Sequence, residues 1–224
     1  MKKRWRRVVH ILLAISILLL AVCLLLLGLL QSVPQRYQQA LDVSEEVHAQ
    51  HAEELSQILD SIESDIGDRS RLVFNVTQSQ LNAWLARELE ANPNVSLPVG
   101  IRQPRVFITR NGLTLMFTIE RSRFSAVISV VLDVRLAEQP NTIEVHLVSV
   151  HAGKLPIRIK RVFDEIEGAM ARSGIQFQWK SGSQRQVALI TIPDELRVHK
   201  QSRRLTLTAL RFRNEEIEVR ADLD

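Results

Sequence analysis

The longest hydrophobic stretch of the chain runs from residue 8 to residue 30 without a single charged side chain. At about 1.5 Å per residue, a helix of this length reaches roughly 34 Å, enough to cross a hydrocarbon layer of about 30 Å. Five basic residues precede it, and such residues stay on the cytoplasmic side: Lys2, Lys3, Arg4, Arg6 and Arg7. We predict a cytoplasmic basic tail over 1–7, a transmembrane signal anchor over 8–30 and an extracytoplasmic location for the rest.

Three other interpretations of this stretch fit less well. A cleavable signal peptide has an apolar core of about 7 to 15 residues and a small-x-small site, and residues 31–37 offer no such site. A lipoprotein signal requires a small residue before the cysteine, but Val22 precedes Cys23. A buried core helix rarely lacks charges over such a length. The signal anchor is therefore the favoured interpretation.

After Pro34, residues 35–66 have the pattern of a second helix, a juxtamembrane stalk that Gly67 ends. Its second half is amphipathic, because apolar residues recur at helical spacing: Leu55, Ile58, Leu59, Ile62 and Ile66. This stripe suits packing on the following domain. It equally suits a short coiled coil that joins two copies through residues 41–66.

Residues 71–76 alternate as a strand and lead directly into Thr77-Gln78-Ser79-Gln80. This is a capping box, in which Thr77 caps a helix and Gln80 reaches back to the start of the same helix. We expect that helix to pack on a sheet through Leu81, Trp84, Leu85 and Leu89.

From residue 104 the hydrophobic period changes to two. Segments 105–110 and 113–120 flank Asn111-Gly112, the strongest short signal for a hairpin. A helix is predicted over 157–173. Further strands are predicted over 125–136, 143–150, 175–180, 187–192, 204–212 and 216–221.

The predicted fold class is α+β, with an N-terminal transmembrane helix and an amphipathic stalk helix before a single domain over 68–224. We expect that domain to contain a curved, mostly antiparallel sheet of about eight strands with two packing helices. A curved sheet with a helix in its concavity can enclose an apolar groove or be filled by its own side chains.

Charge and cysteine content support an exported domain. The formal net charge of +4 becomes −1 once the five cations of 1–7 are set aside, because 24 Lys and Arg then face 25 Asp and Glu. A nucleic-acid partner is not expected from such a balance. Cys23 is the only cysteine, so the exported part has no disulfide.

The sequence contains no catalytic motif, and we expect neither an enzyme nor a cofactor. His48 and His51 have a spacing that could bind a metal, but the polar stretch around them is typical of a solvated helix face. His146 and His151 fall on opposite faces of a strand, and Asp133 is expected to share the solvent face of its strand with Arg135.

Two basic clusters are candidate contacts for anionic headgroups. The first surrounds the start of the helix at 157–173, where helix geometry also favours anions: Lys154, Arg158, Lys160 and Arg161. The second lies late in the chain: Lys200, Arg203, Arg204, Arg211 and Arg213. Scattered surface charge, balanced by nearby acids, is the alternative interpretation of both.

The order of these signals resembles the YpmS-like family of bacterial membrane-anchored proteins and, more distantly, the LmeA-like and tubular lipid-binding exported domains. The resemblance covers residues 70–175, with matches at Leu81, Asn82, Leu85, Gly153, Leu155 and Pro156 and a departure at Trp84. It implies an apolar groove for an acyl chain and no catalytic residues. Lining residues would include Trp84, Leu85, Phe117, Val130, Phe163 and Met170.

Two functions are consistent with this pattern. The first is a non-enzymatic interaction or scaffold role at the bacterial inner membrane, with an envelope protein or a second copy as partner. The second is the binding of a lipid or other amphiphile between helices and sheet. An envelope enzyme of unrecognised type is a third, weaker possibility.

Overall fold

The computed structural model describes residues 25, 28–65, 70–91, 100–121, 124–157, 176–183, 186–198 and 201–224. The expected anchor over 8–30 falls largely outside these residues, and the helix expected over 157–173 falls almost entirely outside them. Within the described residues, no helix combines the length and the apolar character that crossing a membrane requires.

The described part is α+β, and all its strand pairs are antiparallel. Residues 28–30 are helical. Three further helices follow: α2 (Gln35–Leu41), α3 (Glu45–Asp65) and α4 (Gln78–Ala91). The strands are β1 (Arg71–Thr77), β2 (Ile101–Thr109), β3 (Gly112–Arg121), β4 (Phe124–Leu136), β5 (Thr142–Ala152), β6 (Leu155–Pro156), β7 (Gln176–Trp179), β8 (Val187–Thr191), β9 (Glu195–Val198), β10 (Gln201–Arg213) and β11 (Glu216–Leu223).

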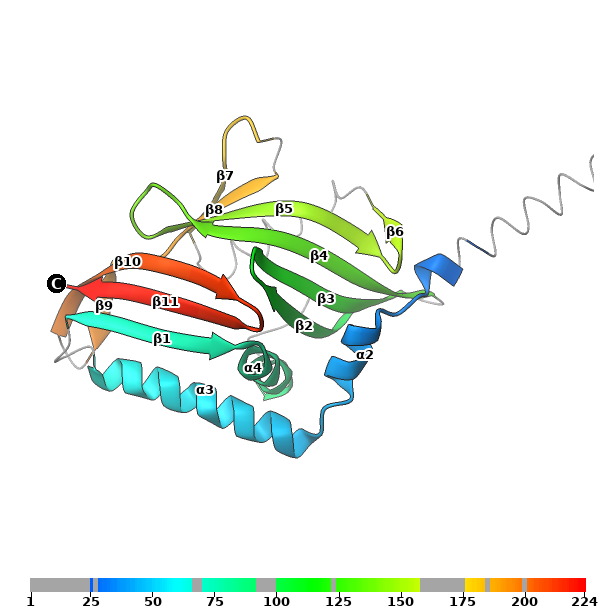
Figure 1. Cartoon of the computed structure of the whole chain (residues 1–224), viewed down its shortest axis with the longest axis horizontal. Coiled ribbons are helices and arrows are strands. Elements are labelled where there is room, and N and C mark those ends of the chain that lie inside the picture. The colour runs from blue at the N-terminus through cyan, green and yellow to red at the C-terminus, as the bar shows by residue number, and fades with distance from the viewer. Residues whose placement is uncertain are drawn as a thin grey trace, which may run out of the picture.

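The expectation of one sheet with about eight strands is wrong, because the strands form two sheets. A seven-stranded sheet has the order β2-β3-β4-β5-β8-β7, with β6 pairing β5. A four-stranded sheet has the order β1-β11-β10-β9 and joins the start of the domain to its end (Figure 1). Alternating side chains identify strands but not their partners, so the sequence pattern does not reveal this division.

The segment expected as one helix over 35–66 forms two helices, α2 and α3. Asp42, Val43 and Ser44 separate them, and the Ser44 carbonyl accepts the N–H of His48 in the first turn of α3. Asp and Ser favour helix ends because their side chains compete for backbone hydrogen bonds. The break lets α2 pack on the seven-stranded sheet while α3 runs along the four-stranded sheet (Figure 1).

Both helices pack on the domain. Tyr37 of α2 is only 1% exposed and forms a cluster with Phe107, Met116 and Val127 on one face of the seven-stranded sheet. In α3, Leu55 is buried, and Ile62 packs together with Leu205 against Leu72 and Leu223 of the four-stranded sheet.

The capping box at the start of α4 forms as the sequence predicts. The Thr77 N–H donates to Gln80 Oε1 at 3.0 Å, and the Gln80 N–H donates to Thr77 Oγ1 at 3.2 Å. The predicted hairpin around Asn111-Gly112 also forms, between β2 and β3.

Helix α4 lies between the two sheets (Figure 1). Its side chains form hydrogen bonds to the backbone of β2, the edge strand of the seven-stranded sheet. Asn82 donates to the Val106 carbonyl at 2.9 Å and accepts the Val106 N–H at 2.7 Å. Gln78, one turn earlier, accepts the Ile108 N–H at 2.8 Å. These amides satisfy backbone groups that an open sheet edge would leave unpaired.

We expect Asn82→Ala to lower the free energy of unfolding by roughly 2 kcal/mol, because the partly buried N–H and carbonyl of Val106 lose their partner. Arg87→Ala, at an exposed position of the same helix, should change it by less than about 0.5 kcal/mol. Urea denaturation followed by circular dichroism measures both values. Equal effects of the two variants would contradict the role of Asn82.

Candidate functional site

The structure places Phe117 and Val130 of the expected groove in one apolar cluster. Val130 is buried with Ile128, Val150 and Ala152, and Phe117 packs against them. This cluster lies on the face of the seven-stranded sheet opposite Tyr37, because neighbouring strand residues such as Met116 and Phe117 point to opposite faces.

Trp84 and Leu85 lie on α4, which packs on α3 and β2. Trp84 is 39% exposed. The described contacts do not bring these two side chains into the cluster of Phe117 and Val130. Phe163 and Met170, the remaining groove candidates, lie outside the described residues.

Among the candidate headgroup contacts, Lys154 is described, in the turn between β5 and β6. Its side chain is exposed, and its backbone N–H donates to the Leu29 carbonyl at 3.0 Å. Arg158, Lys160 and Arg161 lie outside the described residues.

A cleft of about 590 Å³ lies where β10 meets the seven-stranded sheet. Its apolar lining comes from both sheets, and polar groups stand beside it: Val131, Leu132, Val134, Val148, Leu210 and Phe212, with Thr109, Arg110, Asn111 and Asp133. Val148 is the extra residue of a β-bulge in β5, since Leu132 pairs with Leu147 and Val131 with Ser149.

This cleft has the volume of a small-molecule site and combines apolar walls with a few polar groups. The sequence gives no direct signal for it, for two reasons. A bulge does not alter composition, and the approach of Leu210 and Phe212 depends on the packing of two sheets.

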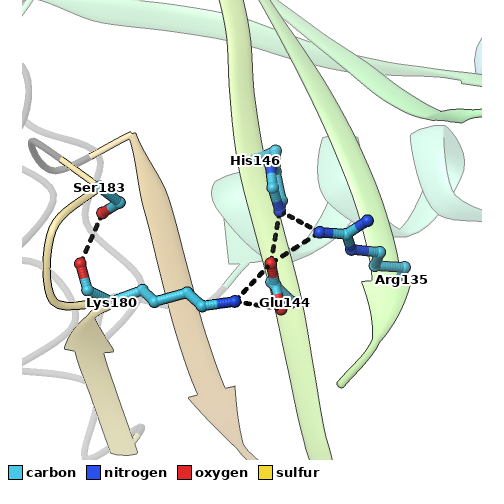
Figure 2. A network of polar contacts seen from close by, with 5 residues as sticks. All are labelled: Arg135, Glu144, His146, Lys180 and Ser183. Carbon is cyan, nitrogen blue, oxygen red and sulfur yellow. Dashed lines mark hydrogen bonds and ion pairs between the residues drawn. The ribbon is translucent and has the colours of Figure 1, made fainter. Parts of the chain in front are cut away.

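A buried carboxylate, Glu144, contacts three cationic or ionisable side chains (Figure 2). Alternation along β4 puts Arg135 on the same face of the seven-stranded sheet as Val127, which is the face that carries Tyr37. Glu144 Oε1 lies 2.8 Å from Arg135 Nη2 and 2.5 Å from His146 Nε2, and Glu144 Oε2 lies 3.3 Å from Lys180 Nζ. Strand pairing sets this geometry, because Arg135 and Glu144 are directly opposite each other on β4 and β5.

These contacts hold the pKa of Glu144 at about 2, chiefly through the hydrogen bond from Arg135 and next through that from His146. The carboxylate therefore stays ionised at neutral pH and is a poor general acid or base there. His146 Nε2 also lies 2.8 Å from Arg135 Nη2, so the ring finds a partner whichever nitrogen carries the proton.

A second buried carboxylate lies on the four-stranded sheet. Glu218, with a side chain 5% exposed, accepts from Arg213 at 2.8 Å and from Arg220 at 2.6 Å, and Arg211 lies 3.8 Å away. The sequence drew attention to Arg211 and Arg213, but not to Glu218 or Arg220. Alternation places Glu218 and Arg220 on one strand face, yet only pairing with β10 brings the cations together.

The stalk histidines occupy helix α3, where His51 Nδ1 lies 3.0 Å from Glu54 Oε2. Across the part of the chain that the structure describes, His, Cys, Asp and Glu side chains form no group of three that could hold a metal ion.

We expect Glu144→Gln to lower the free energy of unfolding at pH 7 by roughly 2 kcal/mol, less than for a fully buried pair because Arg135 and Lys180 are more than half exposed. Because folding depresses the pKa of Glu144, its contribution is complete above about pH 4.5 and is lost as pH falls toward about 2. The difference in the free energy of unfolding between wild type and Glu144→Gln, measured by urea denaturation, should therefore decrease as the pH falls over that range.

Glu120→Gln is the matched control, since Glu120 pairs with Arg102 at an exposed position. Its effect should stay within about 0.5 kcal/mol at pH 7. If the free energies of unfolding of wild type and Glu144→Gln differ by the same amount from pH 7 to pH 3, the low pKa of Glu144 is contradicted.

Comparison of the chain with protein-family models, curated proteins and solved structures finds no match. The resemblance to the YpmS-like family therefore stays a prediction from short motifs.

Proposed function

We propose that the protein is a single-pass, membrane-anchored interaction protein of the bacterial envelope, with a non-enzymatic role. In this proposal the apolar segment that begins at residue 8 anchors the chain in the inner membrane, its last residues, 28–30, pack on the domain, and the domain lies outside the cytoplasm. One observation carries the proposal: residues 28–41 pack tightly on the domain. These residues include the end of the expected anchor and the segment that follows it.

The first attachment is at the β5–β6 turn. Lys154 donates its backbone N–H to Leu29, and Leu30 packs against the apolar cluster around Val130. Gly153 has φ +56°, and a Cβ at this position would lie 2.3 Å from the Leu29 carbonyl oxygen. Only glycine permits so close an approach of the two backbones.

The second attachment is α2. The Tyr37 hydroxyl donates to the Gln103 carbonyl at 2.8 Å and lies 3.1 Å from the Thr118 hydroxyl. The buried Arg105 donates through Nε to the Ala40 carbonyl near the end of α2 at 3.1 Å. Burial is the main cause that raises the pKa of Tyr37, so the hydroxyl stays protonated at neutral pH and can act as the donor.

An anchor followed by such attachments would hold the domain in one orientation instead of on a flexible tether. A fixed orientation suits a protein that presents one face to a partner. The two buried carboxylates, Glu144 and Glu218, also support binding over catalysis, because both are held in ion pairs with arginines.

Helix α3 offers one possible partner surface. Leu55 and Ile62 face inward, whereas Val47 and Leu59 are exposed. A second copy or an envelope protein that uses residues 41–66 would therefore contact Val47 and Leu59 and not the buried stripe.

We expect Gly153→Val to release the domain from its fixed orientation, because the new side chain would collide with the carbonyls of Leu29 and Leu30. The measurement is time-resolved anisotropy of a dye at Asp224→Cys, in a Cys23→Ser full-length chain inserted in lipid nanodiscs. The parent chain should rotate slowly with the disc, and the variant should add a faster component on the nanosecond scale.

Gly182→Val is the matched control, since Gly182 also has a positive φ but no atom lies near its Cβ position. It should leave the anisotropy decay unchanged. A chain that does not enter the nanodiscs would contradict the anchor. A Gly153→Val chain that enters them and rotates like the parent would contradict the fixed orientation.

Amphiphile binding is the second candidate function, and the cleft between β4 and β10 favours it. A tail would lie against Leu210 and Phe212, with Arg110 beside a polar head. This places the ligand in a different part of the molecule from the groove expected around Trp84 and Leu85.

If the cleft holds an amphiphile, Val148→Asp should reduce the co-purified ligand by at least about fivefold, because a charge would face the apolar tail. Val148 is 61% exposed, so the change should not disturb folding. Native mass spectrometry with extraction of bound lipids gives the measurement. Val73→Asp, at a similarly exposed valine on β1, is the control, and equal ligand loss in both variants would contradict the cleft.

A further inference from the structure

The outward face of the four-stranded sheet is rich in arginine. Register places five arginines on this face among the described side chains, together with three carboxylates: Arg71, Arg204, Arg211, Arg213 and Arg220, with Glu216, Glu218 and Asp222. The opposite face carries Leu72, Leu205 and Leu223, which pack with Ile62 of α3. The arginine face is therefore the one that meets solvent.

Three of these arginines surround one buried carboxylate, whose single charge cannot neutralise all three. Arg211, Arg213 and Arg220 have side chains 58%, 57% and 41% exposed, whereas Glu218 beneath them is 5% exposed. Each guanidinium has five N–H donors in a planar fork that matches a carboxylate. Register also places Glu216 opposite Arg213. Arg211, Arg213 and Arg220 with Glu216 and Glu218 therefore carry a local formal charge of +1, and the exposed guanidinium groups keep N–H donors at the surface.

From these observations we propose that this face binds an extended, acidic segment of a partner polypeptide. Arg211 and Arg213 are two residues apart on β10, about 7 Å along a strand. Carboxylates at alternate positions of an extended peptide repeat at the same distance. Glu218, held by Arg213 and Arg220, is an internal example of the contact that a partner carboxylate would make.

The position of this face favours a polypeptide over a lipid surface. The C-terminus lies at one end of the long axis and residues 28–30 lie toward the other. The β10–β11 hairpin, where β10 ends with Arg211 and Arg213, lies near the middle, with the length of β3 between it and residues 28–30 (Figure 1). If the chain enters the membrane before residue 28, the arginine face lies away from the lipid headgroups. The preference for a polypeptide over a lipid surface rests on the proposed membrane anchor. The arginine contacts on this face do not depend on that anchor.

The test is binding of a fluorescent ten-residue peptide of alternating Glu and Thr to the full chain in detergent, measured by anisotropy at low ionic strength. The same peptide with Gln in place of Glu should bind at least about tenfold more weakly, and added salt should weaken the Glu peptide. Arg211→Gln with Arg213→Gln should reduce affinity for the Glu peptide by at least about tenfold.

Arg102→Gln with Lys154→Gln is the matched control, because it removes the same charge at two exposed positions outside the four-stranded sheet, one on β2 and one in the β5–β6 turn. It should bind the peptide like wild type. Arg211→Lys with Arg213→Lys keeps the charge but loses the planar fork, and should bind roughly threefold more weakly than wild type. If the double Gln variant does not fold, the double Lys variant serves as the test instead.

Equal affinity of wild type for the Glu and Gln peptides would overturn the proposal, as would equal weakening by the control pair. Capture of the chain by phosphatidylglycerol vesicles through Arg211 and Arg213, without binding of the Glu peptide, would overturn the choice of a polypeptide. Because the peptide is measured in solution, failure of the anchor would leave this result unchanged.

Discussion

The architecture depends on side-chain amides that hydrogen-bond to open strand edges, because no described strand of one sheet pairs with a strand of the other. Asn82 replaces a neighbouring strand for Val106 at the β2 edge. Asn141, in the β4–β5 turn, donates to the Leu205 carbonyl and accepts the Leu207 N–H, each at 2.7 Å. The amide group supplies one donor and one acceptor, as a peptide unit does, so each asparagine joins elements that lack a common ladder.

The hydrogen bonds of Asn141 also determine where the cleft and the arginine face lie. Asn141 fixes β10 next to a bulge in that strand, where the register with β11 shifts between Leu207 and Ala209. Beyond the bulge, Leu210 and Phe212 reach the cleft, and Arg211 and Arg213 point to the outer face. A single strand thus contributes both an apolar wall and a cationic surface, because adjacent strand residues point to opposite faces.

Attachment of residues 28–41 gives the proposed functions a common physical basis. Tyr37 and Arg105 hold α2 against the seven-stranded sheet, and Gly153 allows the backbone near Leu29 to approach the β5–β6 turn. If the preceding apolar segment is in a membrane, the cleft and the arginine face occupy set positions relative to that membrane. Either site would then meet its ligand from a constant direction.

The sequence by itself determined the local elements. The Thr77–Gln80 capping box, the Asn111-Gly112 turn and the alternating strands depend on neighbours within a few residues, so their patterns predicted them correctly. Only the tertiary structure decided the division into two sheets and the ion pairs of Glu144 and Glu218. These features depend on which distant strands pair, as β1 does with β11, and alternation along one strand carries no information about its partner.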